Sequence, residues 1–154
     1  MADTKNITAF LKLIRWCEHY PHEPNDLNYK TMYGGEILTS LADHPHRTVT
    51  KWGNTSSAAG AYQITQKTFD EYKLKLGLTD FSPESQDKIA MQIIKEKRAS
   101  DGKTALDLIN EGQIETALTL LTGRWTSLPG GKQSQVKMPD ALKKFEEFKA
   151  SIAN

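Results

Sequence analysis

The sequence predicts an α+β fold in which helices dominate, and three observations lead to this prediction. Apolar residues recur at helical spacing near the N-terminus and again from residue 65 onwards. Between residues 20 and 60 this period is absent, and proline, glycine and short β-forming runs such as Thr48-Val49-Thr50 take its place. The chain also shows no internal repeat. We therefore expect a first helix, then loops with a small antiparallel sheet, and then several helices.

The first predicted helix runs from Ile7 to His19, with Asn6 as its N-cap. Its apolar face consists of residues at helical spacing: Ile7, Phe10, Leu11, Ile14 and Cys17. Further helices are predicted over residues 65–76, 83–97, 104–110, 113–122 and 139–152. Gly77 is a typical residue for the end of the second helix, and Ser82 followed by Pro83 is a typical start for the third.

Length and composition predict one soluble domain over residues 1–154, because 38% hydrophobic and 25% charged residues are ordinary for a globular chain. The 20 basic and 19 acidic side chains give a net charge of +1, so we expect no nucleic-acid partner. The N-terminus lacks the pattern of a signal peptide, and no apolar run approaches the ~18 residues of a membrane span. We expect synthesis in a cytoplasm and no membrane insertion. The single cysteine, Cys17, has no partner for a disulfide.

Glu18 stands out because it falls in the middle of the apolar stripe of the first helix, at ~100° per residue. A buried carboxyl group resists ionisation, and a raised pKa is what a general acid requires. Glu18 is therefore the first candidate for catalysis. The structural alternative is that this side chain, at the helix end, bends into solvent or pairs with Arg15 one turn earlier.

Several unusual strings stand in a consistent order across about three quarters of the chain, which is more specific than any single short motif. They are Trp16-Cys17-Glu18, Tyr33-Gly34-Gly35-Glu36, Asp43-His44-Pro45, Ala58-Ala59-Gly60-Ala61-Tyr62-Gln63, Phe81-Ser82-Pro83 with Gln86-Asp87, and Trp125-Thr126-Ser127-Leu128-Pro129-Gly130. With these strings the chain resembles the phage lambda endolysin family. The resemblance implies a lysozyme-like fold with a small antiparallel sheet beside a substrate cleft.

The resemblance also implies a peptidoglycan lytic transglycosylase with Glu18 as its catalytic acid. Such an enzyme cuts the β-1,4 bond between N-acetylmuramic acid (MurNAc) and N-acetylglucosamine (GlcNAc), and it leaves 1,6-anhydro-MurNAc ends without using water. A hydrolytic muramidase would ordinarily need a second carboxylate, roughly 5 to 9.5 Å from the first. Asp26, Glu36 and Asp43 are the candidates, so the hydrolytic alternative stays open.

A glycan strand offers hydroxyls, acetamides and flat apolar ring faces, so its site should combine polar groups with aromatic surfaces. The resemblance implies a cleft lined by Gly60, Tyr62 and Gln63 and, opposite them, by Trp125, Ser127, Leu128, Pro129 and Gly130. Glu36 and Trp52 are further candidates for substrate binding, from their places in the irregular segment. Core packing is the alternative for Tyr62 and Trp125, and a solvated charge is the alternative for Glu36. The loops 51–60 and 128–139 are expected to form mobile edges of the substrate cleft, with Trp52 stacking on a sugar ring.

Other chemistries fit the sequence less well. Cys17 and His19 are two residues apart on a helix and so face different directions, which disfavours a cysteine peptidase. His44 and His46 lack a third zinc ligand at a recognisable spacing, so we expect no metal ion, and we expect no cofactor either. A non-catalytic glycan-binding module is the remaining alternative, and it differs from an enzyme in whether Glu18 is needed for lysis.

Family members commonly carry glycine where this chain has His19, and a cation beside Glu18 would lower the pKa of that acid. The lack of a signal peptide implies that the enzyme, expected as a monomer, waits in the host cytoplasm for release by a separate holin. The expected partner is then a peptidoglycan glycan strand.

Overall fold

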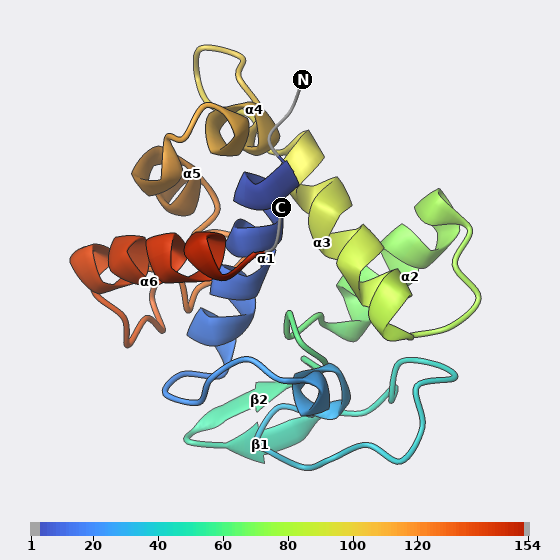
Figure 1. Ribbon diagram of the computed structural model, residues 1–154. Helices are drawn as coiled ribbons and strands as arrows, with labels where there is room; N and C mark the ends of the chain where they lie inside the picture. Colours follow the sequence, from blue (N-terminus) through green and yellow to red (C-terminus); the bar gives the residue numbers. More distant parts are fainter. Residues whose placement is uncertain (1–3, 153–154) are drawn as a thin grey trace. The chain divides into compact units, whose positions relative to one another are not determined.

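The computed structural model describes residues 4–152, and within this range it contains six α-helices, one 3-10 helix and two strands (Figure 1). The elements are α1 (Thr4–Glu18), η1 (Asp26–Lys30), β1 (Val49–Lys51), β2 (Asn54–Ser56), α2 (Gln66–Leu76), α3 (Pro83–Glu96), α4 (Ala105–Asn110), α5 (Ile114–Leu120) and α6 (Met138–Ser151). The helices expected from periodicity are all confirmed. Every helix among the described residues is too short or too polar to cross a membrane.

The chain divides into two compact units, and the division falls within α3. The first unit comprises residues up to Glu23 and from Met91 onwards, and the second runs from Pro24 to Ala90. A single catalytic domain over the whole chain stays a prediction.

The first unit is built around α1, which packs against α6 and α4, while α5 packs against α4 and α6 (Figure 1). The apolar face of α1 is fully buried at Phe10, Leu13 and Ile14. The prediction of Asn6 as an N-cap is wrong, because α1 begins at Thr4 and Asn6 lies inside it. The Asn6 side chain is buried and donates a hydrogen bond to the carbonyl oxygen of Ile109 at 2.9 Å. A tertiary hydrogen bond to α4 has replaced the local capping bond.

The second unit carries the predicted small sheet, which is a two-stranded antiparallel hairpin over the described residues. Its strands are joined by Trp52 and Gly53, and both have positive φ angles, 54° and 76°. A two-residue hairpin turn of type I′ requires positive φ at both positions. The element that the sequence analysis missed is η1, which Asn25 caps by accepting a hydrogen bond from the backbone N–H of Leu27.

The ends of α2 and α3 follow the expected signals. The side chain of Thr65 accepts a hydrogen bond from the backbone N–H of Thr68, and Gly77 ends α2 in the left-handed conformation at φ 67°. Ser82 caps α3 by accepting a bond from the backbone N–H of Ser85 at 3.3 Å. These caps fix both ends of α2 and the start of α3.

Candidate active site

Glu18 is the last residue of α1, and it keeps partial exposure while its neighbours Trp16 and Cys17 are buried. Its Oε2 accepts a hydrogen bond from the hydroxyl of Ser127 at 3.2 Å. Burial raises the pKa of Glu18 from 4.5 to about 8, and the bond from Ser127 offsets only part of that rise. The residue as a whole is partly exposed, whereas its carboxyl group is poorly solvated. At neutral pH this carboxyl carries a proton, as a general acid must.

Cys17 cannot act as a nucleophile in this setting. Its side chain is buried, and burial together with the neighbouring Glu18 raises the pKa of the thiol to about 12. The thiolate is the nucleophilic form of cysteine, and it is scarcely populated at neutral pH with such a pKa. The cysteine peptidase alternative is thereby set aside.

The loop after α5 holds Ser127 beside Glu18. A Cβ atom on Gly131 would lie 2.3 Å from the carbonyl oxygen of Thr126, so the two ends of this loop approach closely only because residue 131 is glycine. The same carbonyl accepts a hydrogen bond from the backbone N–H of Gln133 at 3.0 Å. The loop is thus closed upon itself, and Ser127 is fixed within it.

The other predicted residues of this loop divide by exposure. Trp125, Leu128 and Pro129 are buried, whereas Gly130 is exposed with φ 90°. Burial agrees with the alternative that Trp125 anchors the loop from beneath. Within this loop, the side chain that meets Glu18 is that of Ser127.

In the second unit, Gly60, Tyr62 and Gln63 lie in one tight turn. The backbone N–H of Gly60 donates to the carbonyl of Thr31 at 2.8 Å, and that of Gln63 donates to the carbonyl of Gly60 at 3.2 Å. The ring of Tyr62 is fully buried, and its hydroxyl donates to Asp87 Oδ1 at 2.6 Å. Tyr62 therefore packs as a core residue, which was the alternative to glycan contact.

Gln63 is the polar residue that this turn presents. It is partly exposed and has a positive φ of 48°, which is uncommon for a residue with a side chain. Its Nε2 donates to the carbonyl oxygens of Thr31 and Gly60, at 3.1 and 2.9 Å. Both amide hydrogens are thus bonded to backbone carbonyls, and within residues 4–152 no hydrogen bond to Oε1 is formed. That oxygen is available to accept a hydrogen bond from a ligand.

Trp52 lies at the tip of the hairpin with 71% of its surface exposed. Its ring contacts Tyr33 edge to face, with 5.6 Å between the ring centroids, and the Nζ of Lys51 lies 5.0 Å from the centroid of the indole. These contacts orient the indole without covering it. Exposure and orientation are both properties of a sugar-stacking surface.

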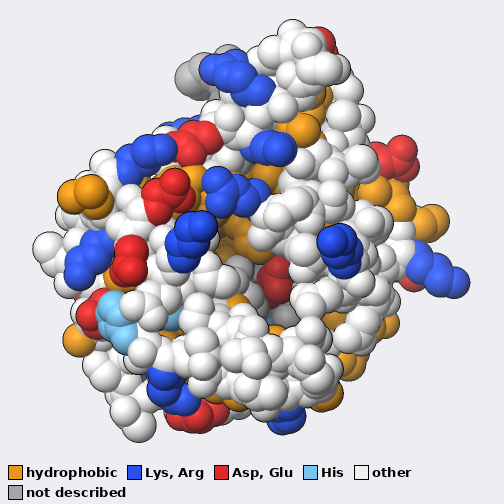
Figure 2. Space-filling model, turned by 180° about the vertical axis from the view of Figure 1, so that it is seen from behind, with side chains coloured by type: hydrophobic (Ala, Val, Ile, Leu, Met, Phe, Trp, Pro, Cys, Tyr) orange, Lys and Arg blue, Asp and Glu red, His pale blue; other side chains and the backbone are white. Residues whose placement is uncertain are grey.

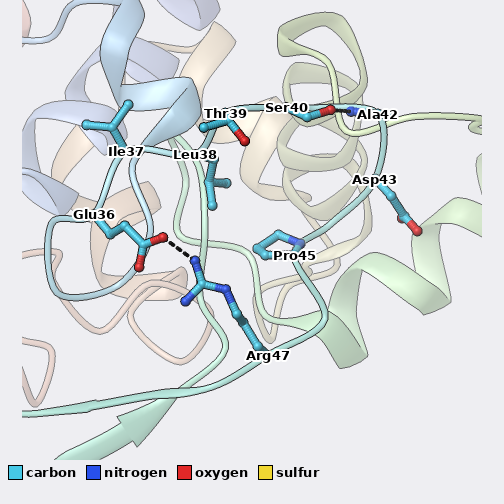
Figure 3. A pocket seen from close by; sticks show the side chains of 9 residues that line it. All are labelled: Glu36, Ile37, Leu38, Thr39, Ser40, Ala42, Asp43, Pro45 and Arg47. Carbon is cyan, nitrogen blue, oxygen red and sulfur yellow. Dashed lines mark hydrogen bonds and ion pairs between the residues drawn. The ribbon is translucent and has the colours of Figure 1, made fainter.

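Glu36 is exposed, and its Oε2 accepts a hydrogen bond from Arg47 (Figure 3). Both side chains line an open pocket of about 370 Å³ (Figure 3). The pocket is lined by Glu36, Ile37, Leu38, Thr39, Ser40, Ala42, Asp43, Pro45 and Arg47. Glu36 was expected to contact the substrate, and the structure gives its carboxylate a guanidinium partner within the protein.

The two histidines considered as zinc ligands are engaged elsewhere. His44 is buried and stacks on Phe69, and its Nε2 lies 2.9 Å from the carbonyl oxygen of Ile64. Burial lowers the pKa of His44 and favours the neutral ring. His46 contacts Asp43 at 2.9 Å and Gln66 at 2.7 Å. Across residues 4–152, no group of three or more histidine, cysteine or acidic side chains is arranged to hold a metal ion.

The sequence alone assigned no role to Gln86 and Asp87, a polar pair on α3. Gln86 is fully buried, and its Oε1 accepts from the backbone N–H of Ala61 at 3.0 Å. Asp87 accepts the hydroxyl of Tyr62. The signal that points to Gln86 is its position on the same helical face as Ile89 and Ile93, where an apolar residue is expected.

Comparisons with known proteins agree with this fold. The family described as Endolysin matches residues 8–152. The endolysin of Escherichia phage lambda is 37% identical over 150 residues, covering 94% of this chain and 91% of the relative. The endolysin of Escherichia phage P2 is 35% identical over 144 residues, covering 85% and 84%.

Two solved structures are similar over 96% of both chains. One is bacteriophage lambda lysozyme complexed with a chitohexasaccharide, at a TM-score of 0.83 and 34% identity. The other is lysozyme from bacteriophage lambda, at a TM-score of 0.81 and 33% identity. These matches confirm the lysozyme-like fold, which defines the protein as an enzyme of the lysozyme class.

The chain belongs to the endolysin family. As a phage endolysin of the lysozyme type it degrades peptidoglycan, and the non-catalytic alternative is set aside.

Proposed function

We propose that this endolysin is a lytic transglycosylase that cleaves the MurNAc–GlcNAc β-1,4 bond, with Glu18 as the acid and then the base. The observation that carries the proposal is the carboxyl group of Glu18, whose pKa burial raises to about 8 although the residue keeps partial exposure. A carboxyl group protonated at neutral pH is suited to protonate a leaving oxygen. Because Ser127 donates to Oε2, Oε1 is left to carry the proton that is transferred.

In the proposed reaction, Glu18 gives its proton to the glycosidic oxygen as the bond from that oxygen to the anomeric carbon of MurNAc breaks. The 6-hydroxyl oxygen of the same MurNAc then bonds to the anomeric carbon. Its proton passes to the Glu18 carboxylate and restores the acid. The products are a 1,6-anhydro-MurNAc end and a free 4-hydroxyl on GlcNAc, so atoms balance without water.

The surroundings of two candidate second carboxylates support a reaction that needs only one. Glu36 is bound by Arg47, and Asp43 is bound by His46. Desolvation acts in the opposite direction, but the hydrogen bonds from His46 and from the backbone of His44 lower the pKa of Asp43. Both carboxylates are therefore engaged as structural anions, whereas a hydrolase would employ one of them as a nucleophile or as a base for water.

We further propose that Gln63 and Trp52 contact the glycan. The structure of the lambda relative with a chitohexasaccharide supports a strand of N-acetylated sugars as ligand. Gln63 offers a free carbonyl oxygen, and Trp52 offers an exposed ring face. The buried Tyr62 supports the turn that carries Gln63. The buried Trp125, Leu128 and Pro129 support the loop that carries Ser127 and the exposed Gly130.

The proposal is tested by Glu18→Gln, which keeps the shape of the side chain and removes its acidity. We expect lysis of purified peptidoglycan to fall about 10²- to 10⁴-fold, the usual contribution of a general acid, while binding of a chitohexasaccharide is retained. Asp26→Asn is the matched control, because Asp26 is an exposed carboxylate at the start of η1. A comparable loss of lysis in Asp26→Asn would favour the two-carboxylate hydrolase instead.

The family resemblance supports two proposals about the cellular setting. The protein acts as a monomer, and it reaches the wall after a separate holin opens the membrane. Expression of this chain alone should leave host cells intact until the membrane is permeabilised, and a sizing column should give the mass of one chain. Prompt lysis without permeabilisation would contradict release by a holin.

A further inference from the structure

Gln86 is a buried polar residue that connects α3 to the turn containing Gln63. Its Oε1 accepts from the backbone N–H of Ala61 at 3.0 Å, and its Nε2 donates to the carbonyl oxygens of Tyr29 and Phe81, at 3.0 and 2.8 Å. Its side chain has no exposure. An apolar side chain in this place would fill the volume without any need for partners, so the amide serves to fix the position of the turn.

Asp87, the next residue on α3, holds the same turn by a second contact. Its Oδ1 accepts hydrogen bonds from the hydroxyl of Tyr62 at 2.6 Å and from the hydroxyl of Tyr29 at 2.8 Å. A carboxylate that accepts two phenolic hydrogen bonds makes strong, directional contacts. Ala61 and Tyr62 are consecutive in the turn. Residues of α3 therefore bind the backbone of Ala61 and the side chain of Tyr62 at neighbouring positions.

Gly60 shows how closely the turn is pressed against α3. A Cβ atom at this position would lie 2.2 Å from Gln86 Oε1 and 3.1 Å from the ring of Phe81. The φ of Gly60 is also positive, at 85°. Both facts restrict position 60 to glycine, and they place Gln86 in direct contact with the start of the turn.

Gln63 at the end of the turn has a backbone conformation that needs such support. A residue with a side chain in the left-handed region costs on the order of 1 kcal/mol or more, and it persists where its surroundings hold it. In this conformation Nε2 reaches the carbonyls of Thr31 and Gly60, which turns Oε1 away from them.

We propose that Gln86 and Asp87 are positioning residues for catalysis: they hold the Gly60–Gln63 turn so that Gln63 Oε1 is fixed to accept a hydrogen bond from an N–H or O–H of the glycan. This inference rests on the proposed glycan contact of Gln63. It assigns to α3 a role in placing the substrate, in addition to its role in the core. Neither residue needs to touch the substrate, because both act through the turn.

A double-mutant cycle tests whether the effect passes through Gln63. Asp87→Leu should lower kcat/KM for peptidoglycan lysis about 10- to 100-fold in the wild-type background, as expected for a misplaced substrate contact. In the Gln63→Ala background the same substitution should change kcat/KM less than about twofold, because the contact it would misplace is gone. Asp87→Asn keeps an acceptor for the two tyrosines and should recover most of the activity.

A purely structural role would give a different result, since the loss of activity from Asp87→Leu would then be the same in both backgrounds. Tyr62→Phe removes one hydroxyl and keeps the ring, so it takes the place of Asp87→Leu in the cycle if the latter fails to fold. Tyr72→Phe, at an equally buried tyrosine on α2, is the matched control and should retain lysis.

Three results would overturn the inference: equal losses in both backgrounds, no loss in either, or wild-type kcat/KM in Gln63→Ala alone. None of them concerns the chemistry at Glu18. Failure of the proposed function would be seen separately, as lysis that survives Glu18→Gln.

Discussion

Glu18 shows how the position of one side chain sets its chemistry. A carboxyl at the end of an apolar helical face is poorly solvated, so its pKa rises to about 8 even though Ser127 donates to it. The sequence made this residue a candidate, because the carboxylate interrupts a regular apolar stripe. The contact with Ser127 could not be derived in this way, since it joins residues 109 positions apart and depends on the tertiary fold.

The raised pKa of Glu18 predicts how stability depends on pH. Between pH 4.5 and about 8 the folded protein retains a proton that the unfolded chain releases, so the free energy of unfolding falls as pH rises through this range. Glu18→Gln removes this dependence and should be more stable than the wild type at pH 9, by about 1 to 3 kcal/mol after allowance for solvent screening. Urea unfolding of both proteins at pH 4.5 and pH 9 measures this difference in the free energy of unfolding. A difference between variant and wild type that is the same at both pH values would contradict the raised pKa.

At the scale of the elements, local signals predicted the helices well. Periodic apolar positions gave all six, and Ser82, Pro83 and Gly77 marked real helix ends. The 3-10 helix η1 was missed because a five-residue element has too few positions to show a period. Asn6 was misread because a tertiary hydrogen bond to Ile109 outweighs its local preference for a cap.

The sequence indicated Gly60, Tyr62 and Gln63 as site residues but not the turn that they form. The close approach of Gly60 to Gln86 is a tertiary contact that the sequence alone does not reveal. The sequence alone could not decide between glycan contact and core packing for Tyr62, and burial decides for the core. Which buried polar residues hold the turn depends on the register of α3 against it, which is a tertiary property.

Gly60→Ala tests the tight packing of this turn. The added methyl group meets Gln86 and forces a strained φ, so we expect a loss of about 2 to 4 kcal/mol in the free energy of unfolding. Gly77→Ala is a matched control, because Gly77 also has a positive φ but no atom within 4 Å of its added Cβ. It should lose only about 1 to 2 kcal/mol. Equal losses in urea unfolding would refute close packing at Gly60.

The hairpin tip gives a prediction about binding. Trp52→Ala should weaken binding of a chitohexasaccharide about fivefold, the value of one stacking contact of about 1 kcal/mol, and should leave the unfolding midpoint nearly unchanged. Leu74→Ala removes another exposed apolar side chain, 88% exposed on α2, and should bind like the wild type. Titration calorimetry compares the affinities of Trp52→Ala and Leu74→Ala for the chitohexasaccharide with that of the wild type. Unchanged binding and lysis in Trp52→Ala would show that the ring does not stack on a sugar.

At the scale of the whole molecule, charge gives little attraction toward the wall. The net charge is +1, and on the face shown in Figure 2 basic and acidic side chains are interspersed. Recognition of peptidoglycan then rests on short-range contacts, such as those proposed for Gln63 and Trp52, more than on a long-range field. The near-neutral composition therefore disfavours nucleic acid as a partner and also leaves substrate binding to short-range contacts.

In the proposed mechanism, one carboxyl group and the sugar's own hydroxyl complete the reaction without water. Mass spectrometry of peptidoglycan digested by the wild-type protein, with Glu18→Gln as the blank, distinguishes this mechanism from hydrolysis. We expect muropeptides that end in 1,6-anhydro-MurNAc and that are absent from the blank. Products that end in reducing MurNAc, each heavier by one water, would contradict the mechanism and identify the enzyme as a hydrolase.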